Sequence, residues 1–268
     1  MNWEVDPESG SVSNRDLDIQ CGFELGDWYS FTSLNSGNLS GTRLLREYDH
    51  SQSFYRADHE ITLHSGSGIV TQSEEFGEHS INRTLILEPT SPIFIGDFVL
   101  RFVVDAHSYP VAQIAGKTFE HQGKNRYLQF DVAKAQLQGE QGTISFEAGN
   151  CSLPDEMSLV VYVRDQPPDQ WVIHIRALAR STGEGFVRLY NNSVKRLPAL
   201  DEIIRLFGLI KFLRYCREYG TRVWYLPNAL PFQYVEYIKL DPTDVLEICA
   251  TCQIDSGLQK PKNNMDGI

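Results

Sequence analysis

The most hydrophobic stretch of the chain runs from Thr84 to Asp105. It is predicted to contain two strands joined by a short turn, Thr84–Glu88 and Ile93–Val104. Successive side chains of a strand point to opposite faces of its sheet. One face of the second strand is apolar except for the gap at Gly96, and it carries Phe94, Phe98, Leu100, Phe102 and Val104. The other face carries Ile93, Ile95, Val99 and Val103, together with Asp97 and Arg101. The pattern therefore predicts a strand buried on both sides, with two charges set into one of its faces.

Many other short segments alternate in the same way and are separated by turns rich in Gly, Pro, Ser and Asn. The clearest are Tyr55–His64, Arg126–Val132, Met157–Arg164 and Trp171–Ala179. No helical period separates these segments. The pattern predicts a mainly β protein whose core, residues 19–195, is an antiparallel β-sandwich or jelly-roll, or a barrel.

One long α-helix is predicted near the C-terminus, at Leu200–Tyr219, with Gly220 as its stop signal. A few strands are expected to follow it, at Arg222–Leu226, Tyr234–Leu240 and Val245–Gln253. We interpret residues 196–254 as this helix with short strands packed on the core. Residues 1–18 are polar and are expected to form a flexible arm, and residues 255–268 a disordered tail.

Composition narrows the function classes. The 268 residues carry a formal net charge of −11, which disfavours nucleic acid and anionic membrane as partners. Between His174 and Arg222, ten basic and four acidic residues give about +6, leaving about −17 elsewhere. This basic segment could accept an anionic ligand, or it could complement the acidic remainder within the fold. The chain shows no signal peptide, no apolar run of transmembrane length and five scattered cysteines, so we expect a cytoplasmic location.

The common cofactor motifs are absent. The chain contains no GxGxxG after a strand, no GxxxxGK[ST], no GxSxG and no HExxH. Cys249 and Cys252 form a single CxxC in an expected strand, where residues three apart face opposite ways, and a structural zinc site usually needs two such pairs. None of the seven histidines forms an HxH or HxD/E pair. We therefore predict no cofactor and no metal.

The candidate chemistry lies in polar residues set into otherwise apolar strands. Asp97 and Arg101 share a face about 13 Å apart, and His174 shares a face with Arg176. These four residues are the predicted catalytic set. The predicted substrate-binding residues are Tyr127, Gln129, Asp131, Trp171, Trp224 and Tyr225.

Burying a charge is costly unless the charge is paired. One interpretation is therefore a structural ion pair, for example between Asp97 or Arg101 and Arg176 or Asp131, or a wet strand face. The other is that these residues converge on a cavity inside or between sheets. There a histidine could act as acid or base and an arginine could hold a carbonyl or anionic oxygen.

Three function classes remain open. The favoured one is a cofactor-independent enzyme that binds a small, largely apolar or polyfunctional molecule and acts by acid–base or templated isomerase, cyclase or lyase chemistry. The second is a non-catalytic carbohydrate- or protein-binding module, in which exposed tryptophans such as Trp28, Trp171 or Trp224 carry the affinity. The third is a jelly-roll structural or assembly protein. For the enzyme we expect a small-molecule ligand as partner, no nucleic acid and no membrane, and the chain is compatible with a homodimer.

Overall fold

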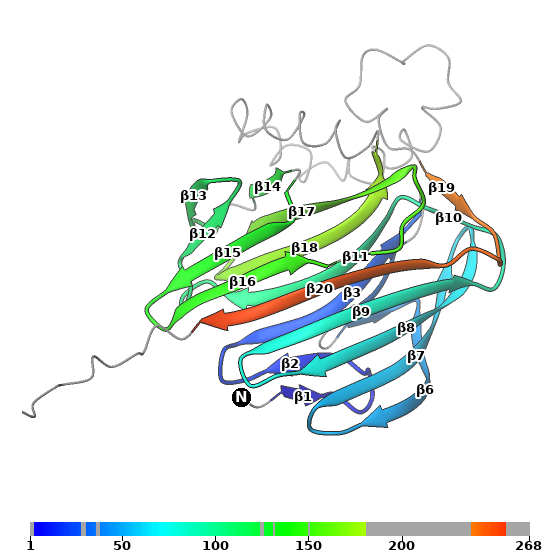
Figure 1. The fold of residues 1–268 in the computed structure, drawn as a ribbon, viewed down its shortest axis with the longest axis horizontal. Helices are drawn as coiled ribbons and strands as arrows, with labels where there is room; N and C mark the ends of the chain where they lie inside the picture. The colour runs from blue at the N-terminus through cyan, green and yellow to red at the C-terminus, as the bar shows by residue number, and fades with distance from the viewer. Residues whose placement is uncertain are drawn as a thin grey trace, which may run out of the picture.

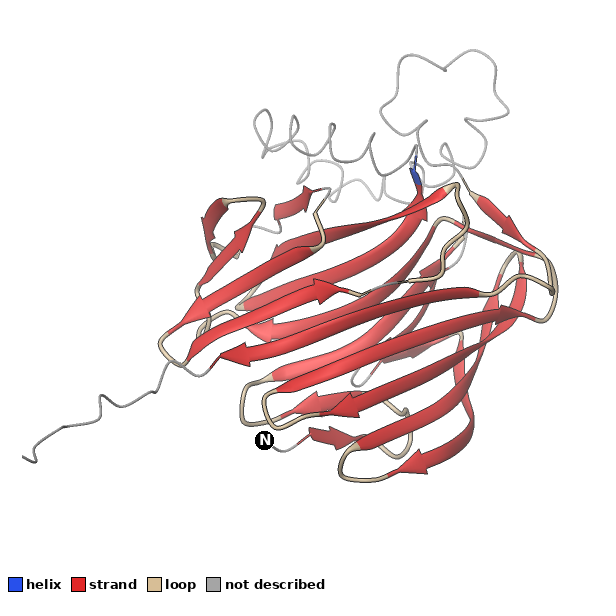
Figure 2. Cartoon of the chain, viewed as in Figure 1, coloured by secondary structure: helices blue, strands red, loops and turns tan. Residues whose placement is uncertain are grey.

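Two nine-stranded antiparallel sheets pack face to face, and a separate two-stranded ribbon lies at one end (Figures 1 and 2). The computed structural model describes residues 3–27, 31–35, 38–123, 126–130, 132–149, 151–180 and 237–255, with the backbone alone at residues 31, 35, 38–40 and 126–130. In the described parts of the chain neither sheet closes on itself. The mainly β, antiparallel sandwich predicted from the sequence is confirmed.

The first sheet has the order β1-β2-β3-β11-β18-β17-β14, and β4 and β5 extend it from β3. Its strands are β1 (Trp3–Val5), β2 (Val12–Asn14), β3 (Ile19–Gly26), β4 (Phe31–Asn35), β5 (Asn38–Ser40), β11 (Asp97–Asp105), β14 (Arg126–Phe130), β17 (Met157–Gln166) and β18 (Gln170–Ala179).

The second sheet has the order β13-β12-β15-β16-β20-β9-β8-β7-β6. Its strands are β6 (Thr42–His50), β7 (Phe54–Leu63), β8 (Gly66–Phe76), β9 (Ser80–Pro89), β12 (Val111–Ile114), β13 (Lys117–Glu120), β15 (Lys134–Gly139), β16 (Gly142–Ala148) and β20 (Leu246–Asp255). The ribbon pairs β10 (Ile93–Ile95) with β19 (Ile238–Leu240).

The core fills the space between the two sheets. On β11, Phe98 and Phe102 are fully buried, and the ring of Phe102 lies 5.0 Å from that of Phe146 on β16 of the other sheet. Burying such side chains stabilises the fold by about 1.5–3 kcal/mol each. On the opposite face of β11, Val99 and Val103 are 1% and 4% exposed. The prediction that this strand is buried on both sides is therefore confirmed.

The predicted hairpin between Thr84–Glu88 and Ile93–Val104 is wrong. β9 pairs with β8 and β20 in the second sheet, whereas β11 pairs with β3 and β18 in the first. The chain crosses between the sheets through β10 and the break at Gly96, where a Cβ atom would lie 2.9 Å from the Tyr237 ring. Alternation shows which face of a strand is buried but not which strand pairs with it.

The two ends of the described chain differ from expectation. Residues expected as a flexible arm instead carry β1 and β2, which pair with each other, and β2 pairs with β3. β20 was expected to pack on the core, but Figure 1 shows it in the middle of the second sheet, between β16 and β9. The predicted helix Leu200–Tyr219 lies outside the described residues. Within those residues, no helix has the length and apolar character needed to cross a membrane.

Candidate functional site

The four predicted catalytic residues share the outer face of the first sheet. Strand pairing sets Arg101 opposite His174, and Val99 opposite Arg176. Because Phe98 and its even-numbered neighbours on β11 point into the core, Asp97 and Arg101 point away from the second sheet. The expectation that these residues face a cavity inside or between the sheets is therefore wrong. Alternation separates the two faces of a strand, but it does not show which of them faces the other sheet and which faces outward.

Glu24 of β3 joins two of these residues. Its Oε1 lies 3.1 Å from Nε of Arg101, and its Oε2 lies 3.7 Å from Nε2 of His174. The three side chains are 14%, 16% and 12% exposed, so the cluster is mostly withdrawn from water. Nε2 of His174 is buried and makes no hydrogen bond. One oxygen atom about 2.8 Å from both Nε2 of His174 and Oε2 of Glu24 would bridge that gap.

Asp97 and Arg176 form an ion pair on the same face. Arg176 donates a short hydrogen bond from Nη2 to Oδ2 of Asp97, and the two side chains are 17% and 22% exposed. This contact is the cross-strand ion pair that the sequence suggested as an alternative to catalysis. The observed structure therefore gives Asp97 a structural partner and leaves Glu24 as the carboxylate nearest to His174.

The electrostatics of the cluster keep His174 uncharged. Burial holds the pKa of His174 well below its usual value, and the positive charges of Arg176, Arg101 and Arg164 lower it further. Burial also lowers the pKa of Arg101, and the Glu24 carboxylate opposes that effect. Near neutral pH the face thus presents a neutral imidazole beside a carboxylate and arginine side chains.

β17 adds an aromatic wall next to His174. The Tyr162 ring lies 5.0 Å from the His174 ring at an interplanar angle of 32°, and Cζ of Arg176 lies 5.5 Å from the centre of the Tyr162 ring. Tyr162 is 5% exposed. The register of β14 with β17 places Gln129 opposite Tyr162, and Tyr127 opposite Arg164. The backbone register thus brings the positions of these two predicted substrate-binding residues beside β17.

Trp171 was predicted to bind substrate, and the structure contradicts this. Its side chain is fully buried between the sheets, where Nε1 donates a 2.8 Å hydrogen bond to the Tyr109 carbonyl and the ring meets His121 edge-on. Trp171 lies three positions before His174 on β18, so the two side chains point to opposite faces, and Trp171 shares the core face with Ile173 and Ile175. Asp131, Trp224 and Tyr225 lie outside the described residues.

Sequence reasoning missed Glu24 and Tyr162. The signal was present, because Gln20, Gly22 and Glu24 alternate with the apolar residues of β3 in the way that Asp97 and Arg101 do on β11. The pairing of β3 with β11 gives Glu24 its place, since it sets Glu24 opposite Val99 and diagonal to Arg101. No local pattern identifies that partner strand.

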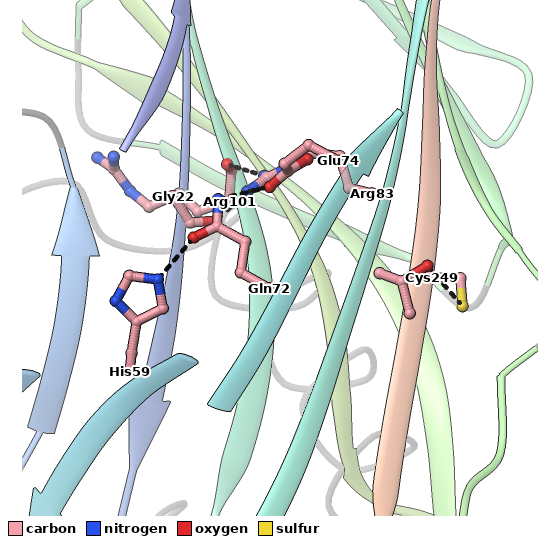
Figure 3. Close-up of polar contacts among 8 residues, drawn as sticks. Gly22, His59, Gln72, Glu74, Arg83, Arg101 and Cys249 are labelled. Atoms are coloured by element: carbon pink, nitrogen blue, oxygen red, sulfur yellow. Dashed lines mark hydrogen bonds and ion pairs between the residues drawn. The ribbon is translucent and has the colours of Figure 1, made fainter. Parts of the chain in front are cut away.

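A buried polar network lies on the core side of the same strands (Figure 3). Arg83 of β9 donates from Nη1 to the carbonyl oxygens of Gly22 and Arg101, at 3.1 and 3.0 Å. These two residues are directly paired across β3 and β11. Arg83 also pairs with Glu74 through Nε, 2.9 Å from Oε2. The network thus ties the second sheet to the backbone that carries the outer-face cluster.

The network continues from Glu74 along the second sheet. Gln72 donates from Nε2 to Oε1 of Glu74 at 2.7 Å, and Nε2 of His59 lies 3.0 Å from Oε1 of Gln72. All these side chains are fully or almost fully buried. Burial raises the pKa of Glu74, and the charge of Arg83 opposes that effect. Burial lowers the pKa of His59 to about 4.

Among the described residues, no group of three or more His, Cys, Asp and Glu side chains is arranged to hold an ion. The CxxC cysteines lie on opposite faces of β20, as expected: Cys252 is buried in the core and Cys249 is partly exposed on the outer face.

Several solved structures resemble the chain, and two of them are described next. A protein from Escherichia coli K12 that was proposed to be an aldose 1-epimerase aligns over 86% of this chain and 74% of its own, at 10% identity and a TM-score of 0.46. A structural genomics target from Synechocystis sp. PCC 6803 aligns over 80% of this chain and 66% of its own, at 9% identity and a TM-score of 0.36. No known protein family and no curated protein matches the chain.

Proposed function

We propose that the chain is a cofactor-independent enzyme that moves protons on a small polyfunctional molecule, as an isomerase, cyclase or lyase, at the outer face of its first sheet. Glu24 and His174 share the acid and base roles, and Arg101 holds an oxygen that gains negative charge. The observation that carries the proposal is the 3.7 Å approach of Glu24 Oε2 to the buried Nε2 of His174, which makes no hydrogen bond.

General acid–base catalysis needs a base that takes a proton from the substrate and an acid that returns one to a neighbouring atom. His174 is held neutral by burial and by neighbouring arginines, and the Glu24 carboxylate is paired with Arg101. Each group can therefore accept a proton before the reaction. The group that takes a proton from the substrate becomes its own conjugate acid and then returns that proton to a neighbouring substrate atom. General acid–base catalysis of this kind contributes about 10²–10⁴-fold to rate.

The arginines supply the electrostatic part of the proposal. A guanidinium is always charged and is the side chain best suited to hold a carbonyl or enolate oxygen in a site that excludes water. Arg101 is 16% exposed, so its field at a bound oxygen is less screened than at the surface. The buried Tyr162 ring packs against the His174 ring and helps to hold the imidazole in place beside Glu24.

A screen for proton exchange tests the proposal. The full-length protein is incubated in D₂O with a panel of small hydroxycarbonyl and polyhydroxy compounds, and ¹H NMR follows loss of signal or interconversion of isomers. We expect turnover of at least one class of compound. Glu24→Gln and His174→Gln should each lower the rate by about 10²-fold or more.

Matched substitutions separate chemistry from folding. Glu88→Gln and His107→Gln change exposed residues of the same types, and we expect both variants to keep the full rate. Suppose instead that a compound binds without being turned over and that Glu24→Gln and His174→Gln leave its affinity unchanged. That result would contradict the enzyme proposal and favour the non-catalytic binding module.

A further inference from the structure

A pair of cysteines meets on the outer face of the second sheet, away from the proposed site. After β16 ends, the chain continues beside β20, where Gly149 N donates to the Cys249 carbonyl at 2.9 Å and Glu247 N donates to the Ser152 carbonyl at 3.0 Å. These two hydrogen bonds bracket Cys151 and hold it beside Cys249. The contact joins residues 98 positions apart in the sequence.

The sulfur atom of Cys151 is in direct contact with Cys249. Cys249 donates its backbone N–H to Sγ of Cys151 at 3.1 Å. The thiol of Cys249 in turn lies 3.4 Å from Oε1 of Glu247. Burial raises the pKa of the Cys151 thiol, and hydrogen bonds from the backbone and the thiol of Cys249 lower it. Both side chains are partly exposed, whereas Cys21 and Cys252 are buried in the core.

We propose that Cys151 and Cys249 form a site of reversible oxidation, at which a peroxide converts the two thiols to an intramolecular disulfide. The neighbouring backbone hydrogen bonds hold the two cysteines together before any oxidant arrives. Bringing the two sulfur atoms to bonding distance then needs rotation about side-chain bonds rather than movement of a strand.

The reaction is balanced by one molecule of hydrogen peroxide. The thiolate of one cysteine attacks an oxygen atom, the O–O bond breaks, and a sulfenic acid forms with release of hydroxide. The second thiol then attacks the sulfenic sulfur, the S–S bond forms, and water leaves with the second oxygen. The two sulfur atoms together lose two electrons, and the peroxide is reduced to two molecules of water.

Cys151 is the better first nucleophile. Burial raises the pKa of both thiols, that of Cys249 to about 11, but the N–H of Cys249 and its thiol partly offset this effect at Cys151. Because the thiolate is the reacting form, the rate should rise up to tenfold per pH unit between pH 7 and 9. The same dependence makes the reaction slow at neutral pH, so the site responds to sustained or concentrated oxidant.

The experiment uses the full-length protein, reduced and then treated with hydrogen peroxide at pH 7, 8 and 9. Mass spectrometry of a non-reduced digest should find the peptides of Cys151 and Cys249 linked, with a mass about 2 Da below their sum. Dithiothreitol should reverse the link. Because the bond closes a loop of about 100 residues and a disulfide typically contributes about 2–4 kcal/mol, the oxidised protein should melt about 4–16 °C higher than the reduced one.

Cys151→Ser and Cys249→Ser should each abolish both the link and the rise in melting temperature, and Ser152→Ala, next to the pair, should change neither. If a variant fails to fold, the comparison of oxidised with reduced wild-type protein still decides the matter. Recovery of separate sulfenic or sulfinic acids at Cys151 and Cys249, without a link at any of the three pH values, would overturn the proposal.

Discussion

Replacing Arg83 with methionine should be among the most damaging single changes in the described core. Both partners of the Arg83–Glu74 ion pair have 0% side-chain exposure. The substitution removes Nε, which lies 3.1 and 2.9 Å from the two Glu74 oxygens, and Nη2, which donates to Oε1 of Glu74 at 3.0 Å. It also removes Nη1, which two backbone carbonyls share. Glu74 then keeps the hydrogen bond from Gln72 and loses its compensating charge.

Breaking a buried pair by removing one partner costs about 3–5 kcal/mol. For a chain of this size, that loss lowers the melting temperature by about 6–20 °C. Equilibrium unfolding in urea measures the free energy directly, and the fluorescence of Trp171, which is fully buried, reports on the core.

The loss should also depend on pH. Burial already raises the pKa of Glu74, and without Arg83 it rises further. Over the range between the ordinary carboxyl pKa and this raised value, the folded state binds more protons than the unfolded state. Stability therefore falls as pH rises through that range, and the deficit of Arg83→Met should be larger at pH 8 than at pH 5.

Two further variants serve as controls. Arg43→Met breaks the pair with Glu60, whose side chains are 71% and 44% exposed, and should cost only about 0–1 kcal/mol. The double variant Glu74→Leu/Arg83→Met removes both charges and should recover much of the stability. A loss below about 1 kcal/mol in Arg83→Met, equal at both pH values, would refute the argument that the pair is buried and mutually dependent.

Three other predictions concern the pKa values of His59 and His174 and the space beside Gly96. His59 has a pKa of about 4 in the fold; it therefore contributes stability that is complete above its unfolded pKa near 6.5 and is lost as pH falls toward 4. His59→Phe should flatten the urea-unfolding free energy over that range, and an unchanged slope would count against this assignment. The titration midpoint of His174 in ¹⁵N NMR spectra should lie well below 6.5, because burial and neighbouring arginines lower its pKa, and a midpoint near 6.5 would contradict its burial among arginines. Gly96→Ala should lower the melting temperature, because the added Cβ would lie 2.9 Å from the Tyr237 ring; a melting temperature equal to that of the wild type would show that the ring moves aside easily.

Strand faces could be predicted from the sequence because the physics of alternation is local. The apolar face of β11 and the polar residues opposite it were both identified from spacing alone. The same reasoning placed Cys249 and Cys252 on opposite faces of β20. In each case the side-chain direction follows from the extended backbone, whatever the partner strand.

Alternation along single strands was enough to predict a β-rich sandwich and a set of polar residues on one face of β11 and β18. The packing of the sheets was needed to show that this face is the outer one, that Glu24 rather than Asp97 approaches His174, and that Cys151 meets Cys249. It also separated β9 from β11, which the sequence had joined in a hairpin. The physical reason is that strand pairing and sheet stacking depend on contacts between distant parts of the chain, which alternation within one strand does not encode.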